Sequence, residues 1–89
     1  MDTNVVIRGK RWRFRSANIK AMGDCDPPHK RGKEIRIRRS LRGLDLLDTA
    51  IHELLHAGSW DLSEEAVEEL AHDIAKALIR AGVVTVNDL

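Results

Sequence analysis

The sequence contains a single cysteine, Cys25, and no apolar run that approaches the roughly 18 residues needed to span a bilayer. One cysteine excludes an internal disulfide, and a partly buried free thiol in a reducing compartment accounts for it. Residues 1–4 lack the basic and apolar regions of a secretion signal. We therefore expect a cytoplasmic protein that does not associate with membranes.

We also expect no second domain, because 89 residues suffice for one domain with a thin core. Internal repeats and low-complexity segments are absent. Hydrophobic residues at 43% and charged residues at 33% are typical of an ordinary globular chain. We expect a single domain over residues 1–89, in which a metal ion that joins two elements would add useful stability.

Net charge is nearly absent, at +1, yet the charges are divided along the chain. Residues 1–43 hold 13 Lys/Arg against 4 Asp/Glu, whereas residues 44–89 hold 2 against 10. We expect these basic and acidic halves to dock on each other. A one-sided basic surface can also attract nucleic acid or an acidic substrate.

The basic half has the alternating pattern of β-strands. Val5-Val6-Ile7 and Arg11–Arg15 predict a hairpin that turns at Gly9, and Glu34–Arg38 predicts a third strand. Residues 16–33, rich in turn formers, predict an ordered loop with little regular structure. Trp12 and Phe14 are expected to face the core. The opposite face would then carry five arginines: Arg11, Arg13, Arg15, Arg36 and Arg38.

The acidic half predicts two helices. Apolar residues at helical spacing indicate a helix over residues 44–57, with Asp45 as a plausible cap and Gly58 as its end. A second helix over residues 63–81 begins at the N-cap Ser63 and stops at Gly82, and residues 83–86 would form a short strand or a packed tail. The predicted fold class is α+β, a small three-stranded antiparallel sheet packed on two helices. The second helix's apolar stripe is Val67, Leu70, Ala71, Ile74 and Leu78.

The first predicted helix contains the sequence His52-Glu53-Leu54-Leu55-His56, an H-E-x-x-H motif. Residues four apart stack on one helical face, and both histidines lie outside the apolar stripe, so both imidazoles can reach one metal ion. Two histidines and a third protein ligand leave one coordination position of zinc open, and water bound there becomes acidic. The motif therefore predicts a metal-dependent hydrolase that holds one Zn²⁺ ion, with Glu53 as general base.

The third ligand is expected from the second helix. Glu64 lies closest to the packed face and follows directly on the loop that returns from His56, so it is our first choice, and Glu68 and Glu65 remain as alternatives. His72 points away from the predicted site on the helical wheel. His29, in the loop after Pro28, could fold over the site.

The motif helix, the glutamate on the next helix and the preceding extended segment Glu34–Arg38 resemble the minimal gluzincin metallopeptidases. Similar short proteins occur in bacteria and their phages, and the ImmA/IrrE and SprT-like families share this core. Over residues 32–78, the resemblance implies a zincin-like core whose edge strand borders a groove for a protein or peptide substrate. It also implies that His52, His56 and Glu64 bind the metal. The chain has no tyrosine, so any tyrosine that stabilises the transition state would be replaced by an arginine, His29 or His72, or would have no counterpart.

Two other functions fit the same sequence. The five arginines of the predicted sheet face could bind the phosphates of nucleic acid, with zinc as a structural clamp. Alternatively, the chain could be an interaction module whose zinc site is catalytically silent.

Overall fold

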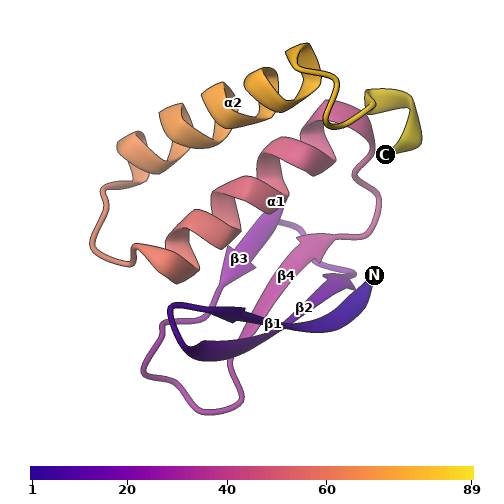
Figure 1. The fold of residues 1–89 in the computed structure, drawn as a ribbon. Helices are drawn as coiled ribbons and strands as arrows, with labels where there is room; N and C mark the ends of the chain where they lie inside the picture. Colours follow the sequence, from indigo (N-terminus) through magenta and orange to yellow (C-terminus); the bar gives the residue numbers. More distant parts are fainter.

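The computed structural model describes residues 1–89 and has the expected α+β class. It contains strands β1 (Asp2–Ile7), β2 (Lys10–Ala17), β3 (Gly23–Cys25) and β4 (Glu34–Arg38), helices α1 (Gly43–Gly58) and α2 (Glu64–Arg80), and a short 3-10 helix η1 (Val86–Asp88). The sheet, α1 and α2 form three successive layers, with α1 in the middle (Figure 1). No helix is both long enough and apolar enough to cross a bilayer.

The sheet has four strands of mixed direction, so the prediction of three antiparallel strands is wrong in part. The strand order is β1-β2-β4-β3, in which β1 and β2 form the predicted antiparallel hairpin but β2 and β4 run parallel. The reason is β3, which lies within the segment 16–33 that we expected to be a loop and which pairs antiparallel with β4. The chain reverses into β3 and again into β4, which restores the direction of β2.

The core lies between the sheet and α1. Trp12 and Phe14 are buried as predicted, and Ile35 and Ile37 from β4 are completely buried beside them. The Trp12 indole donates a hydrogen bond to the carbonyl oxygen of Asp26, 3.1 Å away, so the chain beyond β3 is attached to the core. Strand alternation thus places the aromatic and branched side chains on one face of β2 and β4.

The opposite face of the sheet carries arginines, as predicted, but acids from the same strands pair with three of them. Arg36 lies 2.7 Å from Asp24 and 3.1 Å from both Asp26 and Glu34. Arg15 also contacts Glu34 at 3.2 Å. This hydrogen bond from Arg15 is the main reason that the pKa of Glu34 is lowered. Arg13 pairs with Asp2 at 2.7 Å, so all four acids of residues 1–43 lie in this network.

The helices begin and end close to the predicted residues. Ser63 caps α2 by accepting a hydrogen bond from the Ala66 backbone N–H, and Gly82 follows the helix with a φ of 74°. Asp45 does not cap α1, because that helix begins at Gly43 with Arg42 at the N-cap position and Asp45 in its first turn. The residues after α2 form a turn and η1, which packs on α1 as a tail and not as a strand.

The middle position of α1 determines which of its faces are buried. Its fully buried residues are Thr49, Glu53 and Ala57, spaced four apart on the face toward the sheet. The outer helix α2 buries Val67, Ala71 and Ala75 against α1 and makes no comparable contact with the sheet. The middle residue of this row is therefore a glutamate, Glu53, that is buried between α1 and the sheet.

Gly23 allows β3 to lie close to that buried row. A Cβ atom at Gly23 would lie 2.9 Å from Thr49 Cγ2, 3.0 Å from Glu53 Cγ and 3.1 Å from the carbonyl oxygen of Arg36. The Arg36 oxygen belongs to the backbone of β4, and the Thr49 and Glu53 side chains are buried, so none of these neighbours can easily move. Glycine is needed at this position because two side chains of α1 and the backbone of β4 all approach the strand closely.

Replacing Gly23 with alanine should push β3 away from α1. Overpacking at a close contact of this kind costs about 1–3 kcal/mol of unfolding free energy, which urea denaturation measures. The matched control is Gly58→Ala, whose Cβ would meet only the end of the Ile7 side chain, at 3.1 Å. Equal losses of stability in the two variants would contradict the steric role of Gly23.

Candidate metal centre

Three side chains from the two helices converge on one point. Nε2 of His52 lies 2.8 Å from one carboxylate oxygen of Glu64, and Nε2 of His56 lies 3.0 Å from the other. The two Nε2 atoms lie 3.2 Å apart. These distances bring the predicted ligand set together, with Glu64 in the position that we expected of the third ligand.

Local structure accounts for this convergence. His52 and His56 lie one turn apart on α1, and their rings meet edge to face with centroids 4.8 Å apart. A short connection, residues 59–63, reverses the chain, and the Ser63 cap then begins α2 directly at Glu64. Trp60 in this connection lies edge-on to the His56 ring, with centroids 6.3 Å apart. This tight reversal brings Glu64, the first residue of α2, back to His52 and His56.

The geometry fits a single metal ion. Ligand atoms bonded to one ion at about 2.0–2.1 Å lie about 3 Å apart when the bond angles are near 90–110°. The two histidine nitrogens lie 3.2 Å apart, and each lies within 3.0 Å of a different oxygen of the Glu64 carboxylate, so the separations are of this size. Two imidazole nitrogens and a carboxylate oxygen are also donors that divalent transition metals bind. The group His52, His56 and Glu64 can therefore hold a metal ion.

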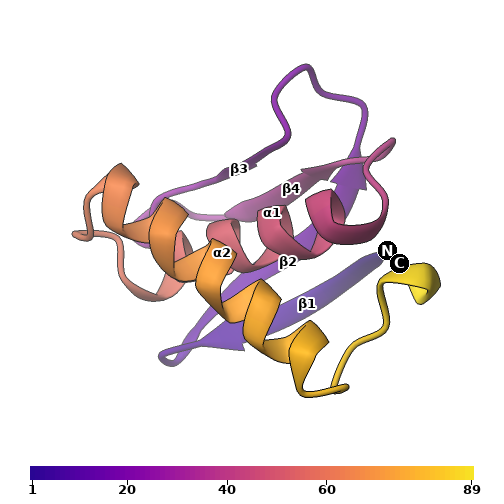
Figure 2. The same ribbon diagram turned by 90° about the horizontal axis from the view of Figure 1, so that it is seen from above.

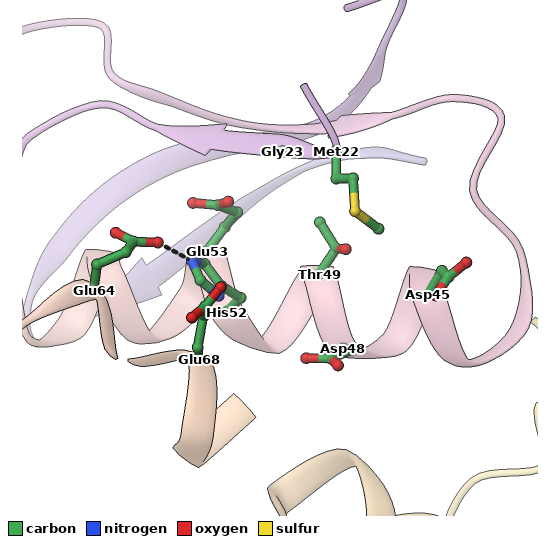
Figure 3. Close-up of a pocket in the computed structure, with 9 residues that line it drawn as sticks. All are labelled: Met22, Gly23, Asp45, Asp48, Thr49, His52, Glu53, Glu64 and Glu68. Atoms are coloured by element: carbon green, nitrogen blue, oxygen red, sulfur yellow. Dashed lines mark hydrogen bonds and ion pairs between the residues drawn. The ribbon is translucent and has the colours of Figure 1, made fainter. Parts of the chain in front are cut away.

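Glu53, the middle residue of the motif, is a buried carboxylate beside this group. Its side chain is only 7% exposed, has no hydrogen-bond or ion-pair partner and points toward β3 (Figure 3). Burial raises its pKa above the ordinary value, the charges on Glu64 and Asp24 act in the same direction, and His52 and His56 oppose them. A carboxylate with a raised pKa is a better proton acceptor than a solvated one.

Two further groups at the site have shifted pKa values. Burial acts to raise the pKa of Glu64, but hydrogen bonds with His52 and His56 outweigh it and lower the pKa. Glu64 is thus held in its charged, ligating form. Burial, and after it the charge on Glu53, raises the pKa of the Cys25 thiol to about 12. Cys25 therefore stays a neutral thiol near neutral pH, in the wall of the groove.

The other predicted candidates lie outside the ligand group. Glu68 lines the adjoining groove, one turn of α2 after Glu64, whereas Glu65 is exposed and does not line it. His72 contacts Asp48 across the two helices, with Nδ1 3.3 Å from Oδ2. His29 is exposed on the turn after β3. Neither histidine lines the groove beside Glu53, where a transition-state helper would have to lie.

Three further residues near the centre were not predicted from the sequence. Gly23, Thr49 and Trp60 all line the groove beside the ligands. Gly23 looked like one turn former among many, and Trp60 looked like part of a plain connection. Only Thr49 could have been found from spacing, because it lies four residues before Glu53 and therefore on the same face of the helix.

Comparisons with protein-family models, curated proteins and solved structures give no match for this chain. The chemistry of the site is therefore the guide to what this protein does.

Metal binding should depend on the three convergent ligands. We expect the purified protein to bind one equivalent of Zn²⁺ and to unfold at a higher temperature when zinc is added, because the ion binds only the folded state. Glu64→Ala should lose both properties, as measured by elemental analysis and thermal unfolding.

The controls are Glu65→Ala and Glu68→Ala, which remove neighbouring acids of the same helix. Both should bind zinc in the same one-to-one ratio as the unaltered protein. If Glu68→Ala lost the ion and Glu64→Ala kept it, the assignment of Glu64 as the third ligand would be wrong.

Proposed function

We propose that this protein is a zinc-dependent metallopeptidase of the minimal gluzincin type. The observation that supports this most is the unpartnered, buried carboxylate of Glu53 next to the His52, His56 and Glu64 group. A structural metal site needs its ligands alone, whereas hydrolysis also needs a base within reach of the attacking water. The lone cysteine fits action in the cytoplasm.

The free edge of β3 supports a peptide as the substrate. The Met22 carbonyl and the Asp26 N–H bond to β4, so strand alternation directs the backbone groups of Gly23 and Cys25 away from the sheet. Both residues line the groove beside Glu53. An extended peptide can add to such an edge by main-chain hydrogen bonds, which would hold it between β3 and the metal centre.

Each residue then has a defined part in hydrolysis. Zinc, when bound, lowers the pKa of water and polarises a carbonyl oxygen. His52, His56 and Glu64 hold the ion beneath the peptide. Glu53 accepts a proton from the water that attacks the peptide carbonyl and passes it to the nitrogen of the leaving amine. Burial favours both steps, because it keeps the pKa of Glu53 above that of a solvated carboxyl group.

The same donor set also occurs at non-haem iron sites, which use two histidines and one carboxylate. Glu53 favours hydrolysis over oxygen chemistry. An oxygenase has no need of an unpartnered carboxylate beside its metal, whereas a hydrolase needs a group that accepts a proton.

Replacing Glu53 with glutamine should separate metal binding from catalysis. We expect the variant to bind zinc nearly as well as the unaltered protein, while peptide hydrolysis falls by about 10²–10⁴-fold, the usual contribution of a general base. Cleavage of a peptide library, read by mass spectrometry, measures the loss. Glu69→Gln, an exposed acid of α2, is the control and should cleave normally.

Two results would contradict the proposal. Undiminished cleavage by Glu53→Gln would exclude Glu53 as the base. Stoichiometric zinc without cleavage of any peptide would favour an interaction module whose zinc site is catalytically silent.

A second candidate function, binding to nucleic acid, is favoured by a basic hollow beside Arg38, the last residue of β4. Its cavity of about 690 Å³ is lined by no acidic residue. None of its four cations forms an ion pair, in contrast to Arg13, Arg15 and Arg36 on the sheet face. Unpaired cations are available to phosphates, whereas paired ones are already neutralised. The four cations are Lys20, Arg38, Arg39 and Arg42.

Binding at this basic hollow should be strongly salt-dependent. We expect Arg39→Ala/Arg42→Ala to weaken binding to a fluorescent DNA duplex and to reduce the slope of log affinity against log salt by about two, since each lost phosphate contact removes about one. Arg13→Ala, which removes a paired arginine, should leave the slope nearly unchanged. Fluorescence anisotropy at increasing salt measures both. Absence of binding at low salt would exclude this function.

A further inference from the structure

The groove at the metal centre has two ends of different chemistry. One end, with a volume of about 430 Å³, lies along the first turns of α1, and the other, with a volume of about 440 Å³, lies toward the connection between the helices. The two ends share four residues, so they form one continuous groove across the metal centre. The shared residues are Gly23, His52, Glu53 and Glu64.

The first end is acidic beyond the needs of the metal. Asp45, Asp48 and Glu68 line it, and all three lie outside the ligand group (Figure 3). A divalent ion held by His52, His56 and Glu64 carries two positive charges, which would offset only the negative charges of Glu53 and Glu64. Asp45 and Glu68 have no ion-pair partner, and Asp48 has only His72, whose side chain is 53% exposed. No lysine or arginine lines either end, although the chain has 15 of them.

Glu53 adds a second and independent observation. This residue is only 7% exposed, its carboxylate has no hydrogen-bond or ion-pair partner, and it opens onto the same groove. A largely buried carboxylate without a partner is costly unless a ligand completes its surroundings. Glu53 thus gives the groove an unpartnered carboxylate next to the acids of its first end.

The second end adds apolar side chains to the groove. Trp60 and Leu62, which are 41% and 37% exposed, line it, and Cys25 lies in its wall. The edge-on contact with His56 fixes the Trp60 ring beside the metal centre. Two exposed apolar side chains at the end of a groove form a surface for an apolar group of a ligand.

We propose that the groove selects peptides with a lysine or arginine on one side of the scissile bond and an apolar residue on the other. The basic side chain lies against Asp45, Asp48 and Glu68, and the apolar one lies against Trp60 and Leu62. This inference rests on the proposed peptidase function, because that function places the scissile bond over Glu53. It adds the substrate class, which the metal ligands alone do not define.

The test uses the zinc-loaded Glu53→Gln variant, so that binding is measured without cleavage. Fluorescent peptides are compared in matched pairs that differ only by lysine or glutamate at the flanking position. Exposed ion pairs are each worth up to about 1 kcal/mol, so three acids should favour the lysine peptide by about 10-fold or more in anisotropy titrations. Serine in place of the apolar residue should also weaken binding.

Neutralising the acidic end supplies the matched comparison. In the Glu53→Gln background, Asp45→Asn/Glu68→Gln should reduce the preference for lysine to about 3-fold or less, because only Asp48 remains. Glu69→Gln/Asp73→Asn removes the same charge from exposed positions of α2 that do not line the groove, and it should keep the preference. Both pairs are nearly isosteric, so folding should be retained.

The outcomes separate this inference from the proposed function. Equal binding of the lysine and glutamate peptides, or no binding of either, would overturn the inference. Equal loss of preference in both double variants would also overturn it, since general charge and not the groove would then be responsible. Cleavage by the unaltered protein without a charge preference would overturn the inference and keep the peptidase. Selective binding without any cleavage would support the groove and overturn the peptidase.

Discussion

The close approach of β3 to α1 is the constraint on which the rest of this structure depends. At Gly23 the strand comes so near α1 that a single methyl group would collide with the side chains of Thr49 and Glu53, as well as with the carbonyl of Arg36. This contact covers Glu53 and leaves the outer edge of β3 beside the His52, His56 and Glu64 group. Burial of Glu53 and the shape of the groove beside it both follow from one position without a side chain.

The ligands could be predicted from the sequence because their arrangement is local. A spacing of four residues fixes His52 and His56 on one face of a helix, and the Ser63 cap fixes the start of the helix that carries Glu64. Periodicity likewise placed Trp12 and Phe14 in the core. These features depend on a few neighbouring residues, so local rules are sufficient.

The surroundings of the site could not be predicted in the same way. A strand of three residues, Gly23-Asp24-Cys25, has too few positions to show alternation, and β4 stabilises it through pairing that is distant in sequence. Missing β3 also led to the wrong direction for β4. The acids near Arg36 come from two segments, one at β3 and one at the start of β4, so only the folded sheet reveals that the basic half neutralises part of its own charge.

Helix α2 is the outermost layer, and it packs mainly on α1 (Figure 2). Its first residue, Glu64, nevertheless belongs to the group that could hold a metal ion. An ion at the centre would therefore link the middle and outer layers, at the end of the helical hairpin next to the loop between α1 and α2. Without the ion, only packing would join the two helices at this end, so the start of α2 would open more readily than the sheet and α1. Metal supply would then set how often this end of the helical hairpin opens.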